Sequence, residues 1–217
     1  MIFIALLAQA STADLSAEAV KQGLEAQNVV YSKMFDCMDE AVKVELKAHI
    51  TDATPETVTD AALKTCSPVS DEMRSATTKL LSNSWPPEKA RSEADRLTND
   101  ELKGLRQTYI GHVDKILAKP QFSEIRLKVS TMEWSKCVRV KVLAWSKLKE
   151  DAKTIAAAAV TSCQVYRSNL RTALRYSVRG QKLPLSSADD IEASLAQHIN
   201  ENAVSWVVEE RAKSLPK

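Results

Sequence analysis

The chain has 217 residues, 44% of them hydrophobic, and contains only four glycines and seven prolines. This length allows one large or two small domains with a buried core, and so few glycines leave little room for a phosphate-binding loop or a dinucleotide fingerprint. The formal net charge of +2 does not by itself indicate a class of partner. Abundant Ala, Leu, Glu, Lys and Arg with few aromatic residues favour helix over sheet. We therefore predict an all-α protein.

The first thirteen residues carry no charged side chain. Ile2 to Ala8 form a short apolar run, and Ala8-Gln9-Ala10 has the small-x-small form of a signal peptidase site. Residues 1–13 are therefore predicted to be a signal peptide, the alternative being an ordinary apolar start to a first helix. Export to the periplasm or the extracellular space would follow. No later stretch approaches the roughly 20 apolar residues that span a bilayer, so we expect no transmembrane segment in the mature chain.

An internal similarity brings the four cysteines into register. Residues 61–66 (AALKTC) match 158–163 (AAVTSC) at an offset of 97, and Cys37 falls on Cys137 at an offset of 100. Such self-similarity indicates a repeated structural unit. We predict two tandem copies of a disulfide-stapled antiparallel helical hairpin, packed as a helical bundle or short array. The first unit is residues 14–119 (a hairpin over about 28–83 plus helices over about 86–119), and the second is 120–217 (a hairpin over about 121–180 plus a helix over about 187–213).

Each cysteine is predicted to lie on the apolar face of its helix. The face before the first turn follows steps of four and three: Val30, Met34, Cys37, Ala41, Val44 and Ala48. Thr54-Pro55 reads as an N-cap with proline in the first helical turn, which places that turn near residues 51–53. The second turn is expected near Glu150. Each cysteine then lies about 20 Å from the turn of its own hairpin, at the same position along the helix axis as the other cysteine of that hairpin.

This equal spacing predicts the disulfides Cys37–Cys66 and Cys137–Cys163. The alternatives are free buried thiols, a metal site and a reactive cysteine. Zinc ligands normally come in close pairs, which are missing from the sequence, and no cysteine has the cationic setting of a reactive thiol. We therefore expect no metal and no cofactor.

Several further helix boundaries can be predicted. Ser67-Pro68 indicates that the helix breaks or kinks after Cys66, whereas Gln164-Val165 predicts a continuous helix at the matching place in the second copy. Ser84 to Glu88 is a clear break between units. Thr98 to Glu101 reads as a capping box that opens a helix ending before Pro120. Gly180 is expected just past the end of a helix.

Charge is distributed unevenly between the two halves. Residues 121–182 hold thirteen Lys and Arg against four Asp and Glu (+9), whereas residues 31–83 hold six against nine (−3). Four arginines recur every fourth residue and form one stripe of a helix, the arginine face: Arg167, Arg171, Arg175 and Arg179. Such a face suits an acidic protein, an anionic lipid head group or an anionic polysaccharide. The alternative is a solvated face neutralised by acidic residues of a neighbouring helix.

Two classes of function remain at this level. The first is a non-catalytic, exported binding or interaction protein that uses the arginine face. The second is a small periplasmic or secreted enzyme, hydrolase-like, whose site is assembled without a readable motif. No catalytic residue can be named, because His49, His112 and His198 lie on separate segments and the adjacent carboxylate pairs point apart on a helix. Nucleic acid is disfavoured because export removes the usual target and aromatic stacking residues are sparse near the arginines.

Overall fold

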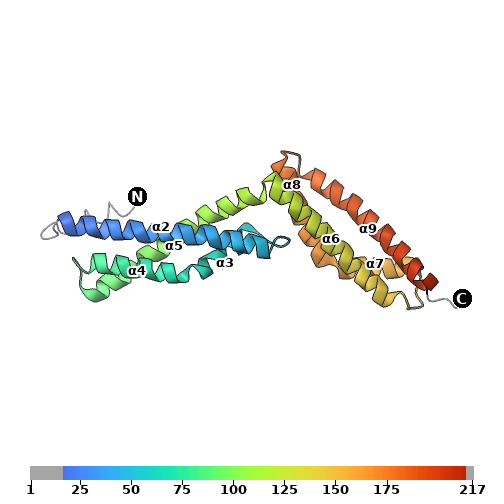
Figure 1. The fold of residues 1–217 in the computed structure, drawn as a ribbon, viewed down its shortest axis with the longest axis horizontal. Helices are drawn as coiled ribbons and strands as arrows, with labels where there is room; N and C mark the ends of the chain where they lie inside the picture. Colours follow the sequence, from blue (N-terminus) through green and yellow to red (C-terminus); the bar gives the residue numbers. More distant parts are fainter. Residues whose placement is uncertain (1–16, 214–217) are drawn as a thin grey trace. The chain divides into compact units, whose positions relative to one another are not determined.

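A computed structural model of the chain describes residues 17–213, with side chains from residue 25 onward, and these residues form eight helices and no strand (Figure 1). The prediction of an all-α fold is confirmed; the predicted signal peptide lies outside the described residues. None of the helices within 17–213 combines the length and the apolar character needed to cross a bilayer. The helices are α2 (Ala17–Ala48), α3 (Pro55–Thr65), α4 (Ser67–Leu81), α5 (Pro87–Leu117), α6 (Pro120–Trp145), α7 (Ala152–Ser162), α8 (Gln164–Gly180) and α9 (Ser186–Lys213).

The described chain divides into two compact units. The first comprises its residues up to Ala48 together with Thr54–Val113, and the second comprises His49–Ala53 and the residues from Asp114 onward. Most of α5 belongs to the first unit, and its last turn belongs to the second. The duplication into residues 14–119 and 120–217 stays a prediction.

Each unit contains one disulfide. Cys37 of α2 is bonded to Cys66, between α3 and α4, with 5.9 Å between the Cα atoms. Cys137 of α6 is bonded to Cys163, between α7 and α8, with 6.0 Å between the Cα atoms. Both separations are ordinary for a disulfide, and the pairing agrees with the one predicted from the spacing of the cysteines. Two such bonds indicate that the protein resides in an oxidising environment.

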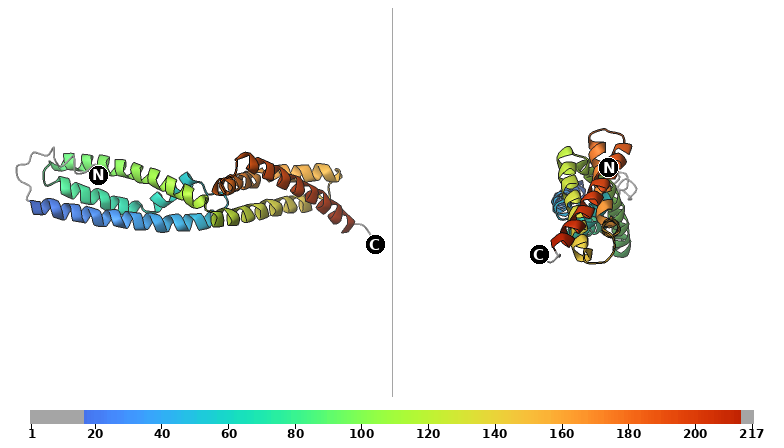
Figure 2. Two further views of the ribbon diagram at one scale, coloured as in Figure 1. Left: turned by 90° about the horizontal axis from the view of Figure 1, so that it is seen from above. Right: turned by 90° about the vertical axis from the view of Figure 1, so that its right-hand side faces the viewer.

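In the first unit, α2 packs along α3 and α4 (Figures 1 and 2). Thr54 caps α3, because its hydroxyl accepts from the Thr57 backbone N–H while the Thr57 hydroxyl accepts from the Thr54 N–H. Pro55 occupies the first turn of α3, as predicted. This closed cap sets the direction in which the chain returns along α2.

The predicted apolar face of α2 is partly wrong. Val44 is 55% exposed and Ala48 is also exposed, whereas Met38, Val42 and Leu46 are buried. The reason is that α2 has two successive partners, with the Cys37–Cys66 bond marking the junction of α4 and α3. The buried face of α2 therefore rotates gradually around the helix axis from one end of the helix to the other. The sequence prediction assumed a single face along the whole helix.

In the second unit, α6 packs against α7, α8 and α9, and α9 also contacts α7 and α8 (Figure 2). Trp134 of α6 is fully buried, and it belongs to a core that the other helices complete. The main contributions to this core are Val138 and Val142 from α6, Ile155 and Ala159 from α7, Leu170, Leu174 and Val178 from α8, and Ile199, Ala203 and Val207 from α9. The arginine face of α8 therefore stands on a packed helical core.

The expectation of a continuous helix through Cys163 is wrong, because α7 ends at Ser162 and α8 begins at Gln164. Cys163 has φ −102° and ψ 22°, and Cys66 has φ −88° and ψ 10°, both in the sparsely occupied region between helix and strand. Proline follows only Cys66 closely. The feature common to both breaks is the half-cystine, so the disulfide, and not proline, accounts for the break in the second unit.

The predicted helix start at Thr98 is also wrong, because α5 is one helix from Pro87 to Leu117. Thr98 lies buried in its interior. A capping residue acts on the unpaired N–H groups of a first helical turn. Since the helix has already begun at Pro87, the N–H groups after Thr98 have carbonyl partners within the helix and the local capping pattern has nothing to cap.

Gly180 has a different role from the one predicted. It is the last residue of α8, and the left-handed residue of the following turn is Lys182 with φ 58°. A Cβ atom built on Gly180 would lie 2.1 Å from the carbonyl oxygen of Ala118. Glycine is therefore required here because the end of α8 closely approaches the chain that precedes α6.

Arg126 of α6 is fully buried in the second unit. Its Nη2 donates to the Thr51 carbonyl oxygen at 3.1 Å, and its guanidinium lies 5.4 Å from the centre of the Tyr176 ring. Loss of hydration on burial lowers the pKa of the Arg126 guanidinium. These contacts hold the segment His49–Ala53 against α6.

Candidate functional site

The arginine face lies along α8, where α8 packs beside α9 in the second unit. The side chains of Arg167 and Arg171 are 38% and 50% exposed, so their charged ends lie at the protein surface. Both reach across to one carboxylate, that of Glu192 on α9. The helix packing that buries Leu170 and Leu174 turns these two arginines toward α9.

Glu192 is the centre of this ion-pair cluster, and its side chain is only 3% exposed. Arg167 Nε donates to Glu192 Oε1 at 2.7 Å, and Arg171 donates to both carboxylate oxygens, from Nε at 2.6 Å and from Nη2 at 3.1 Å. Burial alone would raise the pKa of Glu192, but the hydrogen bonds from Arg171 and Arg167 outweigh it and hold that pKa below its usual range. One buried carboxylate thus serves two guanidinium groups.

The other two arginines of the face differ from each other. Arg179 forms an ion pair with Asp114, and its guanidinium lies 5.1 Å from the centre of the Tyr176 ring. Arg175 is exposed, and the part of the chain that the structure describes places no carboxylate within ion-pair distance of it. Three of the four arginines are therefore paired with acidic residues of other helices, as the alternative of a neutralised face predicts, and Arg175 is the exception among the described residues.

Arg167 also connects the surface to the core. Its guanidinium lies 5.8 Å from the centre of the ring of Trp134, the fully buried tryptophan of α6. A cation over the face of an aromatic ring is attracted by the ring quadrupole. Arg167 is thus held from two sides, by Glu192 and by Trp134.

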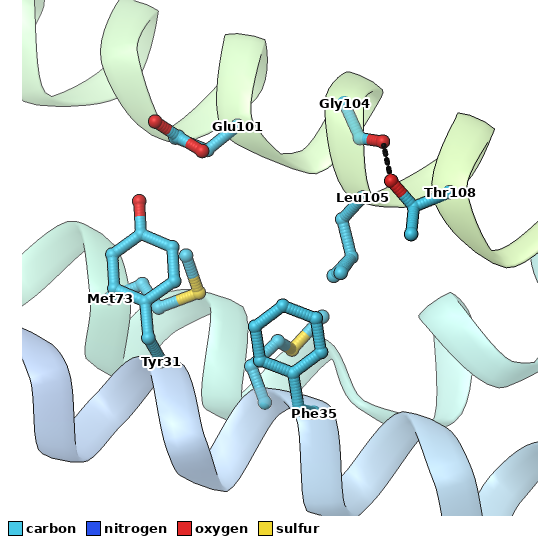
Figure 3. Close-up of a pocket in the computed structure, with 8 residues that line it drawn as sticks. Tyr31, Phe35, Met73, Glu101, Gly104, Leu105 and Thr108 are labelled. Atoms are coloured by element: carbon cyan, nitrogen blue, oxygen red, sulfur yellow. Dashed lines mark hydrogen bonds between the residues drawn. The ribbon is translucent and has the colours of Figure 1, made fainter. Parts of the chain in front are cut away.

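A second candidate site lies in the first unit, where α2, α4 and α5 enclose a pocket of about 170 Å³ (Figure 3). Tyr31 and Phe35 rise from α2 toward α5, and Glu101 projects from α5 above the Tyr31 hydroxyl (Figure 3). Met34 and Met73 are buried beneath the aromatic rings. The remaining lining residues come from α5 and are Gly104, Leu105 and Thr108.

Tyr31 is tied electrostatically to Glu101. Partial burial and the negative charge of Glu101 both raise the pKa of Tyr31. The Tyr31 hydroxyl therefore stays protonated beside the Glu101 carboxylate. Close to the pocket, Phe35 stacks on Tyr109 of α5 with ring centres 6.3 Å apart, and Tyr109 donates to Asp39 at 2.6 Å.

The three histidines, which the enzyme alternative would need, lie at the surface. His198 is 73% exposed and lies beside exposed Glu201 on its own helix, and exposed His49 lies beside Asp52 in the turn between α2 and α3. His112 is exposed and lies edge-on to Tyr109, with ring centres 5.9 Å apart. Within residues 17–213, no group of three or more His, Cys, Asp and Glu side chains is arranged to hold a metal ion.

No sequence pattern predicted a site role for Glu192, Tyr31 or Arg126, and Glu101 was expected only as part of a helix cap. Glu192 lies 21 residues from Arg171 on a different helix, so no local spacing relates the two. Gly104 carried the available signal, because a glycine in the interior of a helix lowers its stability and calls for a reason.

Comparisons with models of protein families, with curated proteins and with solved structures found no match for this chain.

Proposed function

We propose that the chain is a non-catalytic binding protein of the periplasm or the extracellular space, and that its second unit contacts an anionic partner through the arginine face. The two disulfides support a location in an oxidising compartment. The uncharged start of the chain, with its small-x-small sequence, supports export. The observation that carries the proposal is the exposed Arg175, which stands in a half of the chain with a large basic excess.

The charge of the face favours an anionic partner. One carboxylate, that of Glu192, is shared by Arg167 and Arg171, so the cluster of these three residues keeps a positive charge. Asp189 is an additional negative charge that acts on Arg171. Arg175 adds its full charge one helical turn away from Arg171 and Arg179. An arginine guanidinium suits phosphate, sulfate and carboxylate groups because it offers paired N–H donors.

The internal duplication is part of the same proposal. In each unit a disulfide joins a long helix to the cysteine that separates two shorter helices. The first of these shorter helices, α3 or α7, has 11 residues in both units. Positions matching the four arginines in the first copy are Ser70, Arg74, Thr78 and Ser82. Three of the arginines thus belong to the second copy alone, which makes the basic face a property of that copy and not of the shared scaffold.

The variant Arg175→Glu is expected to weaken retention on vesicles containing anionic phospholipid about tenfold or more, since each basic residue near such a surface contributes about 1 kcal/mol and the substitution changes the charge by two. Cosedimentation at low ionic strength measures this, with zwitterionic vesicles as the background. Arg91→Glu is the matched control, an exposed arginine of α5 in the first unit. Equal retention of both variants and the wild type would remove Arg175 from the binding surface.

Parallel arms distinguish the sources of negative charge. An anionic polysaccharide and a strongly acidic protein, each immobilised at matched charge density, replace the vesicles in the same assay. A partner is assigned to the face when its retention is lowered by Arg175→Glu and kept by Arg91→Glu. If the wild type is retained on none of the three, the proposed function is wrong.

A further inference from the structure

The pocket of the first unit is large enough for a small organic molecule. Its volume of about 170 Å³ is close to that of an apolar protein cavity that admits benzene, about 150 Å³. It opens to solvent beside Phe35, which is 45% exposed. A ligand with one ring or a short branched chain therefore fits without a change in the helices.

On α5 the pocket is lined at its solvent-exposed edge by Gly104, which has no side chain. A Cβ atom built on Gly104 would meet no other atom within 4 Å. Thr108, one turn further, is short, and its hydroxyl donates back to the Gly104 carbonyl oxygen at 3.0 Å (Figure 3). Elsewhere α5 is attached to the other helices by longer side chains, such as Arg106, which pairs with Asp60. The space above the methionines is thus left open by the sequence of α5.

The interior of the pocket is apolar and polarisable. Met34, Met73 and Leu105 line it, and both methionines are buried. Methionine adapts to ligands of different shape because its side chain is unbranched and flexible. The rings of Tyr31 and Phe35 offer π faces, which attract cations. Such a lining favours a ligand with an apolar body.

The rim is acidic. Glu101 lies over the pocket, whereas the basic side chains of the surrounding helix faces are occupied by acidic partners: Lys33 pairs with Glu72, Arg74 with Asp71 and Asp95, and Arg106 with Asp60. The charge of Glu101 is therefore not cancelled by these cations. The surroundings are acidic as well, with a net charge of −3 over residues 31–83.

We propose that this pocket binds a small organic cation, an amine or quaternary ammonium group carried on an apolar body, with the cationic group between the Glu101 carboxylate and the Tyr31 and Phe35 rings and the body on Met34 and Met73. The site lies in the first unit and is independent of the arginine face. This site binds a cation, whereas the arginine face binds an anion.

Benzyltrimethylammonium is a suitable probe because it joins a quaternary ammonium group to one ring. Calorimetric titration of the full chain should show binding in the millimolar range or tighter, and benzyl alcohol, which lacks the charge, should bind at least about tenfold more weakly. Glu101→Gln should weaken binding of the cation by at least about tenfold and leave the alcohol unchanged. Asp100→Asn makes the same charge change at the neighbouring position, which does not line the pocket, and should retain binding.

The position of the site is tested by filling it. Gly104→Leu places a side chain in the open space and should abolish binding of the cation, while the higher helix propensity of leucine keeps the chain folded. Gly111→Leu is the control, since Gly111 lies on the same helix, also meets nothing within 4 Å and does not line the pocket. Circular dichroism verifies the fold of each variant. The proposal is overturned if the wild type does not bind the cation, if Glu101→Gln and Asp100→Asn weaken binding equally, or if folded Gly104→Leu binds as the wild type does.

Discussion

Replacing Cys137 and Cys163 together by alanine is expected to lower the free energy of unfolding of the second unit by about 3.5 kcal/mol. The bond joins residues 26 apart, and its loss frees the unfolded chain to adopt the conformations that the closed loop excludes. Alanine is preferred to serine because Cys163 is fully buried, and a hydroxyl there would add its own cost. Denaturant unfolding followed by tryptophan fluorescence measures the effect, since three of the four tryptophans (Trp134, Trp145 and Trp206) belong to the second unit and Trp85 of the first unit can be replaced by phenylalanine in all variants.

The matched control is the alanine pair at Cys37 and Cys66. It removes a bond of similar span, 29 residues, but in the first unit. We expect it to leave the fluorescence transition of the second unit nearly unchanged, while circular dichroism shows the loss in the first unit. If the Cys137/Cys163 pair can be removed without a shift of the fluorescence midpoint, the disulfide does not hold α6 to α7 and α8.

Replacing Glu192 by glutamine is expected to destabilise the second unit by about 2 kcal/mol at pH 7, because two guanidinium groups lose their shared carboxylate. The half-exposed arginines are partly solvated, which keeps the loss below that of a fully buried pair. Glu201→Gln is the control, an exposed position on the same helix. A loss no larger than that of this control would show that Glu192 does not organise the cluster.

The effect of Glu192→Gln has a definite dependence on pH. The pKa of Glu192 is lowered in the folded protein, so the charged carboxylate stabilises the fold at pH values above the unfolded pKa of about 4.3. This contribution is lost as the pH falls through the lowered folded value. The difference between wild type and variant, measured by denaturant unfolding at a series of pH values, should therefore be constant near neutrality and shrink below about pH 4. A difference that grows on acidification would contradict the assignment.

The same substitution bears on the proposed function. Without the Glu192 carboxylate the cluster of Arg167 and Arg171 gains one positive charge, so folded Glu192→Gln should be retained more strongly than the wild type on an anionic surface that the face contacts. The Arg175→Glu and Glu192→Gln variants thus move binding in opposite directions. This contrast separates contact through the face from a general loss of structure.

The elements that the sequence predicts well are those governed by local chemistry. Proline and a threonine cap mark the start of α3, and the turn expected near Glu150 lies directly before α7, which begins at Ala152. Cysteines at equal distances from such turns can be paired because helices rise by a constant amount per residue. The helical content and both disulfides follow from these regularities.

The remaining features depend on tertiary contacts. The break at Cys163 arises from a bond to another helix, so Gln164-Val165 carries no sign of it. Thr98 matches a capping pattern that the preceding helix makes irrelevant. Glu192 becomes a buried anchor only because α9 packs beside α8. The pocket is lined by residues of three helices, and Met73 and Tyr31 lie 31 and 73 positions before Gly104 in the sequence.

Peptide mapping of the protein under non-reducing conditions tests most directly whether each helical unit is closed by its own covalent bond. Digestion and mass spectrometry should recover one linked peptide pair containing Cys37 and Cys66 and another containing Cys137 and Cys163, with no thiol open to alkylation. A linkage between Cys37 or Cys66 and either of the other two cysteines, or four alkylated thiols, would contradict the two-unit account.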